Sequence, residues 1–325
     1  MRGYYACFGR YQDRIGTTQC SKSPVRNPPS SRTQHNLPVS NIRRSHPRLV
    51  SAYRRILLAL PGSVSLSLQY FKAHRFPPNL RSPRTFSEKI QYRKLFDRDP
   101  RLPLLADKIR VKDYVTERLG KDWVIPTLWS GRQFPPRADR DWARPYVIKT
   151  NHGSGRNIFV KTNPDWEKIE RWCESWLRQT WQAHEFQWLY SEIEPQLLVE
   201  PHIGSVDALP VDYKFFVFGG RVEYIHVHTD RDTGHKCVFF NRDWERQSFR
   251  LGYALETREI ERPAHLTEMI SAAETLADDI PFVRVDLYDL DRPLFGEMTF
   301  YPGSGYDRFT PRIWDASFGE LWPWP

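Results

Sequence analysis

The sequence predicts a mixed α+β fold in which most strands pair as hairpins and helices pack on them. Several short segments alternate apolar and polar residues on either side of a glycine or proline turn, as hairpin strands do. Other segments repeat apolar residues at three- and four-residue steps, as amphipathic helices do. The 325 residues, 40% of them hydrophobic, suffice for two or three subdomains with a sizeable core.

Positive charge is concentrated near the N-terminus. Residues 1–50 contain nine Lys and Arg against one Asp, whereas the other 275 residues are close to neutral although the whole chain carries +9. Residues 1–48 are rich in Ser, Pro, Asn and Arg and lack an apolar period, which predicts a disordered basic tail. The folded part is therefore not expected to bind nucleic acid. The tail is expected to be a solvated arm, or to reflect a start codon assigned too far upstream; contact with an anionic membrane or a polyanionic glycan is the alternative.

Cysteine usage and hydropathy favour a cytoplasmic protein. The cysteines at positions 7, 20, 173 and 237 show no disulfide-framework spacing, so a reducing compartment is expected. No N-terminal signal segment is seen, and the apolar stretch 56–68 is broken by Pro61 and Gly62 and is too short to span a bilayer. A buried helix followed by a turn is the simpler interpretation of that stretch. Because Arg54 and Arg55 precede it, a helix lying on the inner face of a membrane is the alternative.

The N-terminal half is predicted to be mostly helical. Residues 49–106 form a helical segment in which Ser87 caps an apolar-periodic run, and 104–120 predict a helix closed by Gly120. A strand, a glycine loop and a second strand follow at 144–162. The next helical region carries an aromatic stripe that is expected to be core: Trp166, Ile169, Cys173, Trp176 and Leu177.

The C-terminal half is predicted to be rich in strands. A strand at 196–204 is followed by a hairpin that turns at Gly219 and Gly220. A helix at 267–280 then leads into a last hairpin with strands at 282–288 and 295–300.

The last hairpin carries two acids on one face. If its turn centres just after residue 291, Asp286 lies directly across from Glu297, and Arg284 lies across from Thr299. The opposite face is predicted to be core: Val283, Val285, Leu287, Met298 and Phe300.

Two facing carboxylates destabilise a ribbon unless a cation or a shared proton compensates them. Oxygen ligands without Cys or His suit Mg²⁺ or Mn²⁺, which are usually held by one or two carboxylates and the phosphates of a nucleotide. The alternative is a solvated face on which Arg284 neutralises one acid. Because like charges face each other, an amide in place of Asp286 or Glu297 is expected to leave the fold intact or more stable.

Three upstream features bear on phosphate binding. The loop 152–157 contains two glycines, whose backbone can approach an anion closely, and Lys149 on the preceding strand adds a positive charge. It is neither a Walker A loop nor a dinucleotide fingerprint, and a plain hairpin turn is the alternative. Lys214 lies among aromatic residues and needs a partner or must reach solvent. Glu200 closes a strand where a connector could contact a base or ribose.

Taken in order, these features resemble the TupA-like family of ATP-grasp proteins, which is associated with teichuronopeptide and polysaccharide biosynthesis. The resemblance runs from about Pro83 to Asp315. It is carried by the segments SPRTFSEKIQ, LADKIRVKDYV, VIKTNHGSGRNIFV, DYKFFVFGGR and FVRVDLYDLDRPLFGEMTFYPGSG.

The resemblance implies an ATP-grasp fold with ATP between two α+β lobes, at 107–198 and 199–325, and with the glycine hairpin as a lid. By match of motif, Asp286 and Glu297 would hold Mg²⁺, or Mn²⁺, on the β- and γ-phosphates. Many ATP-grasp enzymes carry Asn where this chain has Thr299, so a third side-chain ligand is not implied, although the threonine hydroxyl or a water could supply an oxygen.

Roles for nucleotide-binding residues are implied in the same way. Lys108 and Lys149 would contact the phosphates or the base, and Lys214 would lie near the phosphates. The lid residues would be His152, Gly153, Ser154 and Gly155. Glu200 with the connector to Ile203 would frame the adenine, and Asp212 would contact the ribose.

The implied reaction is ATP-dependent ligation of a carboxylate to an amine through an acylphosphate, joining an amino acid to a uronic acid unit in surface or exopolysaccharide biosynthesis. Arg284 could orient the acceptor carboxylate or simply pair with Asp286, and Arg308 is a weaker candidate for the first role. No protein nucleophile is required, and the chain offers no convincing nucleophile set.

Other interpretations remain open from the sequence. A glycosyltransferase would use one of the Asp-x-Asp pairs, at 97–99, 139–141, 230–232 or 289–291, and a glycan- or nucleotide-binding protein would keep the fold without turnover. A zinc site is a further alternative, with the candidate ligands His226, His228, His235 and Cys237.

Overall fold

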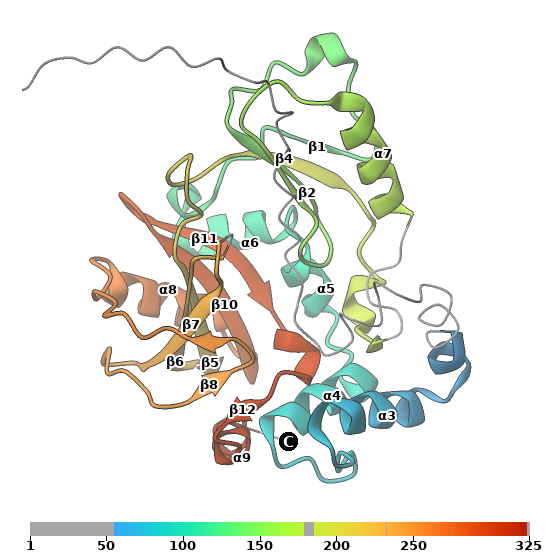
Figure 1. Ribbon diagram of the computed structural model, residues 1–325, viewed down its shortest axis with the longest axis vertical. Helices are drawn as coiled ribbons and strands as arrows, with labels where there is room; N and C mark the ends of the chain where they lie inside the picture. The colour runs from blue at the N-terminus through green and yellow to red at the C-terminus, as the bar shows by residue number, and fades with distance from the viewer. Residues whose placement is uncertain (1–54, 179–184, 232, 324–325) are drawn as a thin grey trace, which may run out of the picture. The chain divides into compact units, whose positions relative to one another are not determined.

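The computed structural model describes residues 55–178, 185–231 and 233–323, all of which fall within one compact unit, Thr33–Pro325. The predicted tail at 1–48 lies outside the described residues. Mixed α and β structure is present, as the sequence predicts, and the strands lie mainly in two sheets (Figure 1).

The larger sheet has six strands in the order β11-β10-β5-β6-β7-β9, and only the β7–β9 pair is parallel. Both predicted C-terminal hairpins are present in it. The strands are β5 (Asp212–Phe218), β6 (Arg221–Thr229), β7 (Lys236–Asn241), β9 (Ala254–Leu255), β10 (Phe282–Asp289) and β11 (Pro293–Thr299). A separate two-stranded sheet pairs β8 (Arg250–Leu251) with β12 (Phe309–Thr310).

The smaller sheet has four strands in the order β1-β4-β2-β3. They are β1 (Trp129–Gly131), β2 (Tyr146–Thr150), β3 (Asn157–Val160) and β4 (Leu197–Pro201). Helix α7 (Trp166–Leu177) packs on this sheet, and all five residues of the predicted aromatic stripe lie in or against its core (Figure 1). The predicted lobe boundary at 198–199 falls within β4, and the division into lobes stays a prediction.

The remaining helices are α3 (Gly62–His74), α4 (Phe86–Phe96), α5 (Arg101–Ala106), α6 (Val111–Leu119), α8 (Leu266–Ala277) and α9 (Ile313–Leu321). Short 3-10 turns occur at Lys121–Trp123, Arg137–Asp139, Trp188–Tyr190 and Pro302–Gly305. One predicted helix, 104–120, is in fact two helices. The break falls at Asp107, whose side chain accepts hydrogen bonds from the backbone N–H groups of Ile109 and Arg110 at 2.8 and 3.4 Å.

Helix α4 begins at a capping box. Thr85, not Ser87 as predicted, is the N-cap: its hydroxyl accepts from the Glu88 N–H, and the Glu88 carboxylate accepts from the Thr85 N–H. Ser87 instead donates its hydroxyl to Asp315 of α9 at 2.5 Å. Both residue types are good caps, and the glutamate three residues after Thr85 is the sequence signal that separates them.

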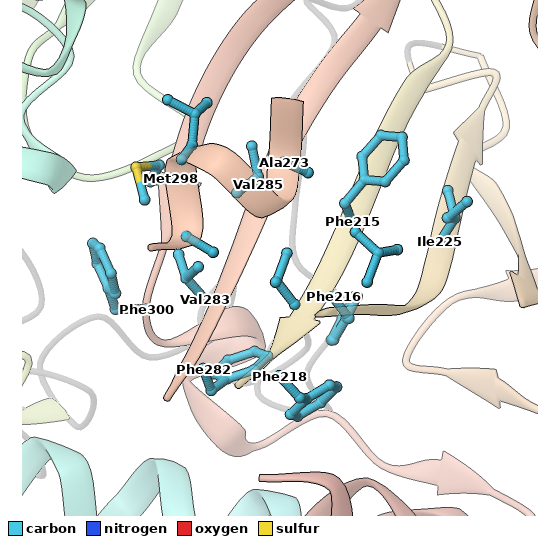
Figure 2. Close-up of a cluster of buried hydrophobic side chains, with 14 of the residues drawn as sticks. Phe215, Phe216, Phe218, Ile225, Ala273, Phe282, Val283, Val285, Met298 and Phe300 are labelled. Carbon is cyan, nitrogen blue, oxygen red and sulfur yellow. The ribbon is translucent and has the colours of Figure 1, made fainter. Parts of the chain in front are cut away.

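The larger sheet is covered on both faces. On one face, Phe215, Val283 and Val285 pack toward Ala273 of α8 (Figure 2). The predicted core side of the last hairpin belongs to this face and is buried throughout. On the other face, one end is filled by aromatic rings such as Phe216 of β5, under α4 and α9. Only the remaining end of that second face is polar.

The register of the last hairpin is as predicted at its polar end. Asp286 pairs with Glu297 and Arg284 with Thr299. Toward the turn the pairing shifts by one residue, because Gly296 is the extra residue of a bulge between the pairs Asp286–Glu297 and Leu287–Phe295. A side chain at Gly296 would come within 2.9 Å of the Asp286 carbonyl oxygen, so the bulge requires glycine.

Thr85→Ala should lower the free energy of unfolding by about 1 kcal/mol, because the first turn of α4 loses its side-chain cap. Urea unfolding would measure the change. Thr116→Ala is the control: this exposed hydroxyl only bonds back to the Lys112 carbonyl within α6, and its removal should change stability by less than about 0.5 kcal/mol. Equal losses in the two variants would contradict the capping role.

Candidate functional site

The polar end of the larger sheet carries a row of facing charged residues. Lys214 of β5 pairs in register with Asp286 of β10, and Asp286 pairs with Glu297 of β11. Residues directly opposite in a sheet point to the same side, so these three side chains share one face. Asp212 and Arg284 lie two residues along their strands and therefore share it too.

Asp286 is held by two cations. Its Oδ2 lies 2.5 Å from the Lys214 Nζ, and its Oδ1 lies 2.7 Å from the Arg284 Nε. Lys214 also contacts Asp212 at 2.6 Å, and Asp212 accepts from Arg231 at 2.9 Å. Burial raises the pKa of Asp286 although both cations act to lower it. Lys214 and Arg284 therefore offset part of the cost of burying this carboxylate.

Glu297 has a different set of partners. Its Oε2 lies 3.0 Å from the Lys108 Nζ, while its Oε1 is 3.6 Å from Arg284 and accepts from the Thr299 hydroxyl at 3.3 Å. Burial acts to raise the pKa of Glu297, but Lys108, Lys214 and Arg284 together lower it far below its ordinary value. Glu297 is therefore ionised throughout the neutral range.

Lys108 connects this hairpin to the glycine loop. Its Nζ donates to the Gly153 carbonyl at 2.8 Å as well as contacting Glu297. Gly153 and Gly155 have φ values of +73° and +71°, which glycine adopts without strain. Ser154 at the tip is exposed, whereas His152 is buried at the base and contacts the Asn151 amide oxygen at 3.1 Å.

The base of the loop is fixed to the start of α6. Asn151 donates to the Asp107 carboxylate at 3.1 Å, and the Lys108 N–H donates to the Asn151 carbonyl at 3.0 Å. Because Asp107 also bonds the first amides of the following turn, one side chain positions both the loop and Lys108. The break between α5 and α6 is therefore part of the site.

A second charge cluster surrounds Glu200 at the end of β4. Lys112 contacts its Oε1 at 2.6 Å, and Lys149 of β2 contacts its Oε2. Burial acts to raise the pKa of Glu200, but the two lysines lower it overall. Burial lowers the pKa of Lys112, with Glu200 acting against that shift. Both lysines are thus held beside one buried carboxylate.

The predicted site residues fall into three places. Lys108, Lys214, Arg284, Asp212 and the paired acids form one connected network, Lys149 and Glu200 form the second cluster, and the residues 152–155 form the loop. Ile203 lies half-buried two residues after β4. Burial lowers the pKa of His74 of α3, and the nearby Arg308 acts in the same direction.

Sequence reasoning missed Lys112 and Arg231. Lys112 follows Lys108 by four residues, a spacing that places both on one side of a helical turn, and this signal was available in the sequence. Arg231 follows β6 in a loop whose path no local pattern indicates. It reaches Asp212 only because the hairpin brings the end of β6 beside the start of β5.

The donor set fits a hard divalent cation. Asp286, Glu297 and the Thr299 hydroxyl offer only oxygen, and Asp212 has a buried Oδ1 without a hydrogen-bond partner. Among the described residues, no three His, Cys, Asp and Glu side chains converge as a metal-binding group. The acids therefore correspond to a two-carboxylate site of the kind that Mg²⁺ completes with phosphate oxygens and water.

The four candidate zinc ligands have other contacts. His228 lies between His226 and His235, with ring nitrogens 3.0 and 2.7 Å apart, and His226 stacks on Phe239. Cys237 points its thiol toward the Leu251 carbonyl at 3.9 Å. The geometry gives the zinc alternative no support.

The described residues of the Asp-x-Asp pairs are either engaged locally or exposed, and Asp139 and Asp141 are both exposed. Asp97 contacts Arg93, and Asp99 contacts Arg101 beside it. Asp289 contacts His265 at 2.6 Å, while Asp291 is exposed in the hairpin turn. Of the pair at 230–232, residue 232 lies outside the described residues.

Two sheets, one carrying a glycine loop and the other a pair of facing carboxylates, form the arrangement expected of an ATP-grasp protein. The family model described as TupA-like ATPgrasp matches residues 88–322. The chain belongs to this family, which confirms both the predicted family and the predicted fold class. No match was found among curated proteins.

Solved structures show weaker likenesses. A D-alanine–D-alanine ligase from Bacillus anthracis matches with a TM-score of 0.40 and 15% identity, over 67% of this chain and 65% of that one. One from Helicobacter pylori gives 0.35 and 16%, over 68% and 62%. The ATP-grasp ligase PsnB gives 0.35 and 11%, over 62% and 54%. This chain spans less than two thirds of each, and the family assignment rests on the family model.

Asp286→Asn should lower the free energy of unfolding by about 3–5 kcal/mol, because Lys214 and Arg284 would lose a buried anionic partner. This reverses the expectation from sequence, which rested on the repulsion between the two facing acids. Urea unfolding measures the loss, and Asp291→Asn in the exposed turn of the same hairpin is the control. A variant as stable as the control would show that the pairs contribute little.

The stability contributed by Glu297 should depend on pH. Because its folded pKa is depressed below the ordinary value of 4.5, the contribution is present above that value and is lost as the pH falls toward the folded pKa. The difference in unfolding free energy between wild type and Glu297→Gln should be largest near neutral pH and shrink below about pH 4.5. Exposed Glu320→Gln is the control, and a pH-independent difference would refute the assignment.

Proposed function

We propose that this protein is an ATP-dependent carboxylate–amine ligase. The observation that carries the proposal is the network in which Lys108 joins the glycine loop to Glu297 while Lys214 and Arg284 hold Asp286. Membership of the TupA-like ATPgrasp family supports the same class of chemistry. Each Lys or Arg side chain in the network is paired with a carboxylate, and a phosphate oxygen could take the place of that carboxylate.

Asp286 and Glu297 are the proposed holders of Mg²⁺, and Mn²⁺ shares the same preference for oxygen. When bound, such an ion would neutralise charge on the β- and γ-phosphates. Asp212, with one carboxylate oxygen lacking a partner, would accept from a ribose hydroxyl. Glu200 and the connector to Ile203 would frame the adenine, with Lys112 and Lys149 beside them.

The glycine loop would cover the phosphates. The exposed Ser154 and the positive φ values of its two glycines allow backbone N–H groups to turn toward an anion. His152 is buried at the base of the loop, so its expected contribution is to hold the loop in place. Lys108 would follow the loop, since it already bonds the Gly153 carbonyl.

The reaction would proceed in two balanced steps. A carboxylate oxygen of the acceptor attacks the γ-phosphorus, the bond to ADP breaks, and an acylphosphate forms. An amine nitrogen then attacks the acyl carbon, phosphate leaves, and the amine loses a proton to solvent. Arg284 would orient the acceptor carboxylate, and Lys214 would offset charge on the transferring phosphoryl group.

The proposed substrates are an amino acid and a uronic acid unit of a surface or exopolysaccharide, or its carrier-linked precursor. This proposal is supported by the association of the TupA-like family with polysaccharide biosynthesis. A cytoplasmic location, at the inner face of the membrane, fits such a substrate.

A glycosyltransferase is the second candidate, but the described Asp-x-Asp pairs are engaged locally or exposed, and none points into the polar network. A non-catalytic nucleotide- or glycan-binding protein is the third. It draws its support from Thr299, which stands where many ATP-grasp enzymes have Asn.

ATP or ADP with Mg²⁺ should raise the melting temperature, whereas UDP-sugars should not. In an ADP-release screen of amino acids against uronic acid acceptors, Glu297→Gln should lower turnover about a hundredfold or more, because an oxygen ligand and the partner of Lys108 are lost. Asp291→Asn should retain wild-type turnover.

Each alternative has its own outcome. Protection by UDP-sugars without protection by ATP would favour the glycosyltransferase. Protection by ATP without ADP release for any acceptor would favour the binding protein. Unchanged turnover in both Asp286→Asn and Glu297→Gln would refute the metal assignment.

A further inference from the structure

Helix α3 is apolar on two opposite sides. One side is buried: Leu66 and Tyr70 pack with Tyr306, and His74 contacts the Gly305 carbonyl at 3.0 Å. The other side, with Val64 and Leu68, faces solvent. A single apolar side is enough to pack a surface helix on a core, so the second apolar side of α3 has no role in that packing.

The exposed side of α3 carries three large apolar side chains. Val64, Leu68 and Phe71 are spaced by four and three residues, so they lie along one side of the helix. With Ser63, Ser67 and Pro77 they line a shallow hollow. Ile56 and Leu58, just before the helix, are exposed as well. We call these five side chains the α3 surface: Ile56, Leu58, Val64, Leu68 and Phe71.

Exposure of this kind is unusual in the rest of the molecule. Among the described residues, twelve large hydrophobic side chains are exposed, and five of them belong to the α3 surface, each 45–60% exposed. The others are scattered along the chain. A clustered exposed apolar surface indicates an interaction site, whereas single exposed residues need no explanation.

The sequence around the α3 surface contains no acid. From residue 14 to residue 87 there is neither Asp nor Glu. Residues 1–87 carry 15 Lys and Arg against one Asp, whereas residues 88–325 carry 33 against 38 Asp and Glu. The chain is therefore divided into a strongly basic part, net +14, and an acidic remainder, net −5. Within the basic part, Arg55, Arg75 and Arg81 are exposed near the α3 surface in sequence.

We propose that the α3 surface docks on an anionic lipid bilayer. The apolar side chains would enter the boundary between headgroups and acyl chains, and the surrounding Lys and Arg would contact lipid phosphates. Neither contribution is sufficient alone: apolar insertion of one short helix is weak, and basic residues bind a membrane surface only while salt does not screen them. Together they give stable, reversible attachment.

A bilayer fits these observations better than other occupants do. A second copy would bring two basic surfaces together, and residues 1–54, with ten Lys and Arg against one Asp, would do the same. Nucleic acid or an acidic glycan would match the charge but leave Leu68 and Phe71 in water. Among the described residues, no helix is long and apolar enough to cross a membrane, so the contact would be made from one side.

The test is co-sedimentation of the full chain with vesicles. We expect binding to vesicles of phosphatidylglycerol mixed with phosphatidylcholine, and little binding to phosphatidylcholine alone. The double variant Leu68→Glu, Phe71→Glu should lower the partition coefficient about tenfold or more, because two inserting side chains become charged. The control variant Ile313→Glu, at an apolar residue that is more exposed than either and lies outside the α3 surface, should bind as wild type.

The melting temperature of the double variant and the salt dependence of wild-type binding complete the test. The melting temperature of the double variant, with and without ATP and Mg²⁺, shows whether it is folded; both positions are exposed, so it should match wild type. High salt should weaken the binding of wild type to anionic vesicles. Binding that is unchanged in the double variant, or equal on neutral vesicles, would overturn the proposal. A wild-type dimer that the double variant loses, without vesicle binding, would assign the α3 surface to a second copy.

Discussion

The site depends on how the charge of Asp286 is compensated. A buried carboxylate facing a second carboxylate cannot be tolerated in a sheet without cations nearby. Lys214 and Arg284 supply them from the two neighbouring positions on the same face, at 2.5 and 2.7 Å. This arrangement explains why a strand as buried as β5 contains a lysine two residues before Phe216 on the same face.

The same compensation prepares the site for a ligand of high negative charge. In the network each cation is paired with a carboxylate, and Lys108 is shared between Glu297 and the Gly153 carbonyl. When phosphates and a divalent ion bind, the Lys and Arg side chains would contact phosphate oxygens instead of carboxylates, and the carboxylates would bind the metal. Because Lys108 touches both the loop and the hairpin, such an exchange couples the position of the loop to occupancy of the hairpin.

Features that depend on periodicity could be read from the sequence, and features that depend on the path of a loop could not. Alternation predicted which side of the last hairpin is core, and the assumed position of the turn predicted that Asp286 faces Glu297. The bulge at Gly296 was not predicted, because the alternation of apolar and polar residues is equally compatible with a regular strand and with a strand that has one extra residue. Arg231 reaches Asp212 through a loop with no regular pattern. The break at Asp107 is set by a side-chain hydrogen bond that competes with helix continuation.

Thr299 gains a physical role from its place in this network. Its hydroxyl accepts from Arg284 at 3.0 Å and lies 3.3 Å from the Glu297 carboxylate, to which it can donate. A hydroxyl oxygen can accept one hydrogen bond and donate another, so this single atom can bridge the Arg284 guanidinium and the Glu297 carboxylate. The larger side chain of asparagine would need separate oxygen and nitrogen atoms for the same two contacts. Threonine at this position therefore keeps Arg284 and Glu297 connected.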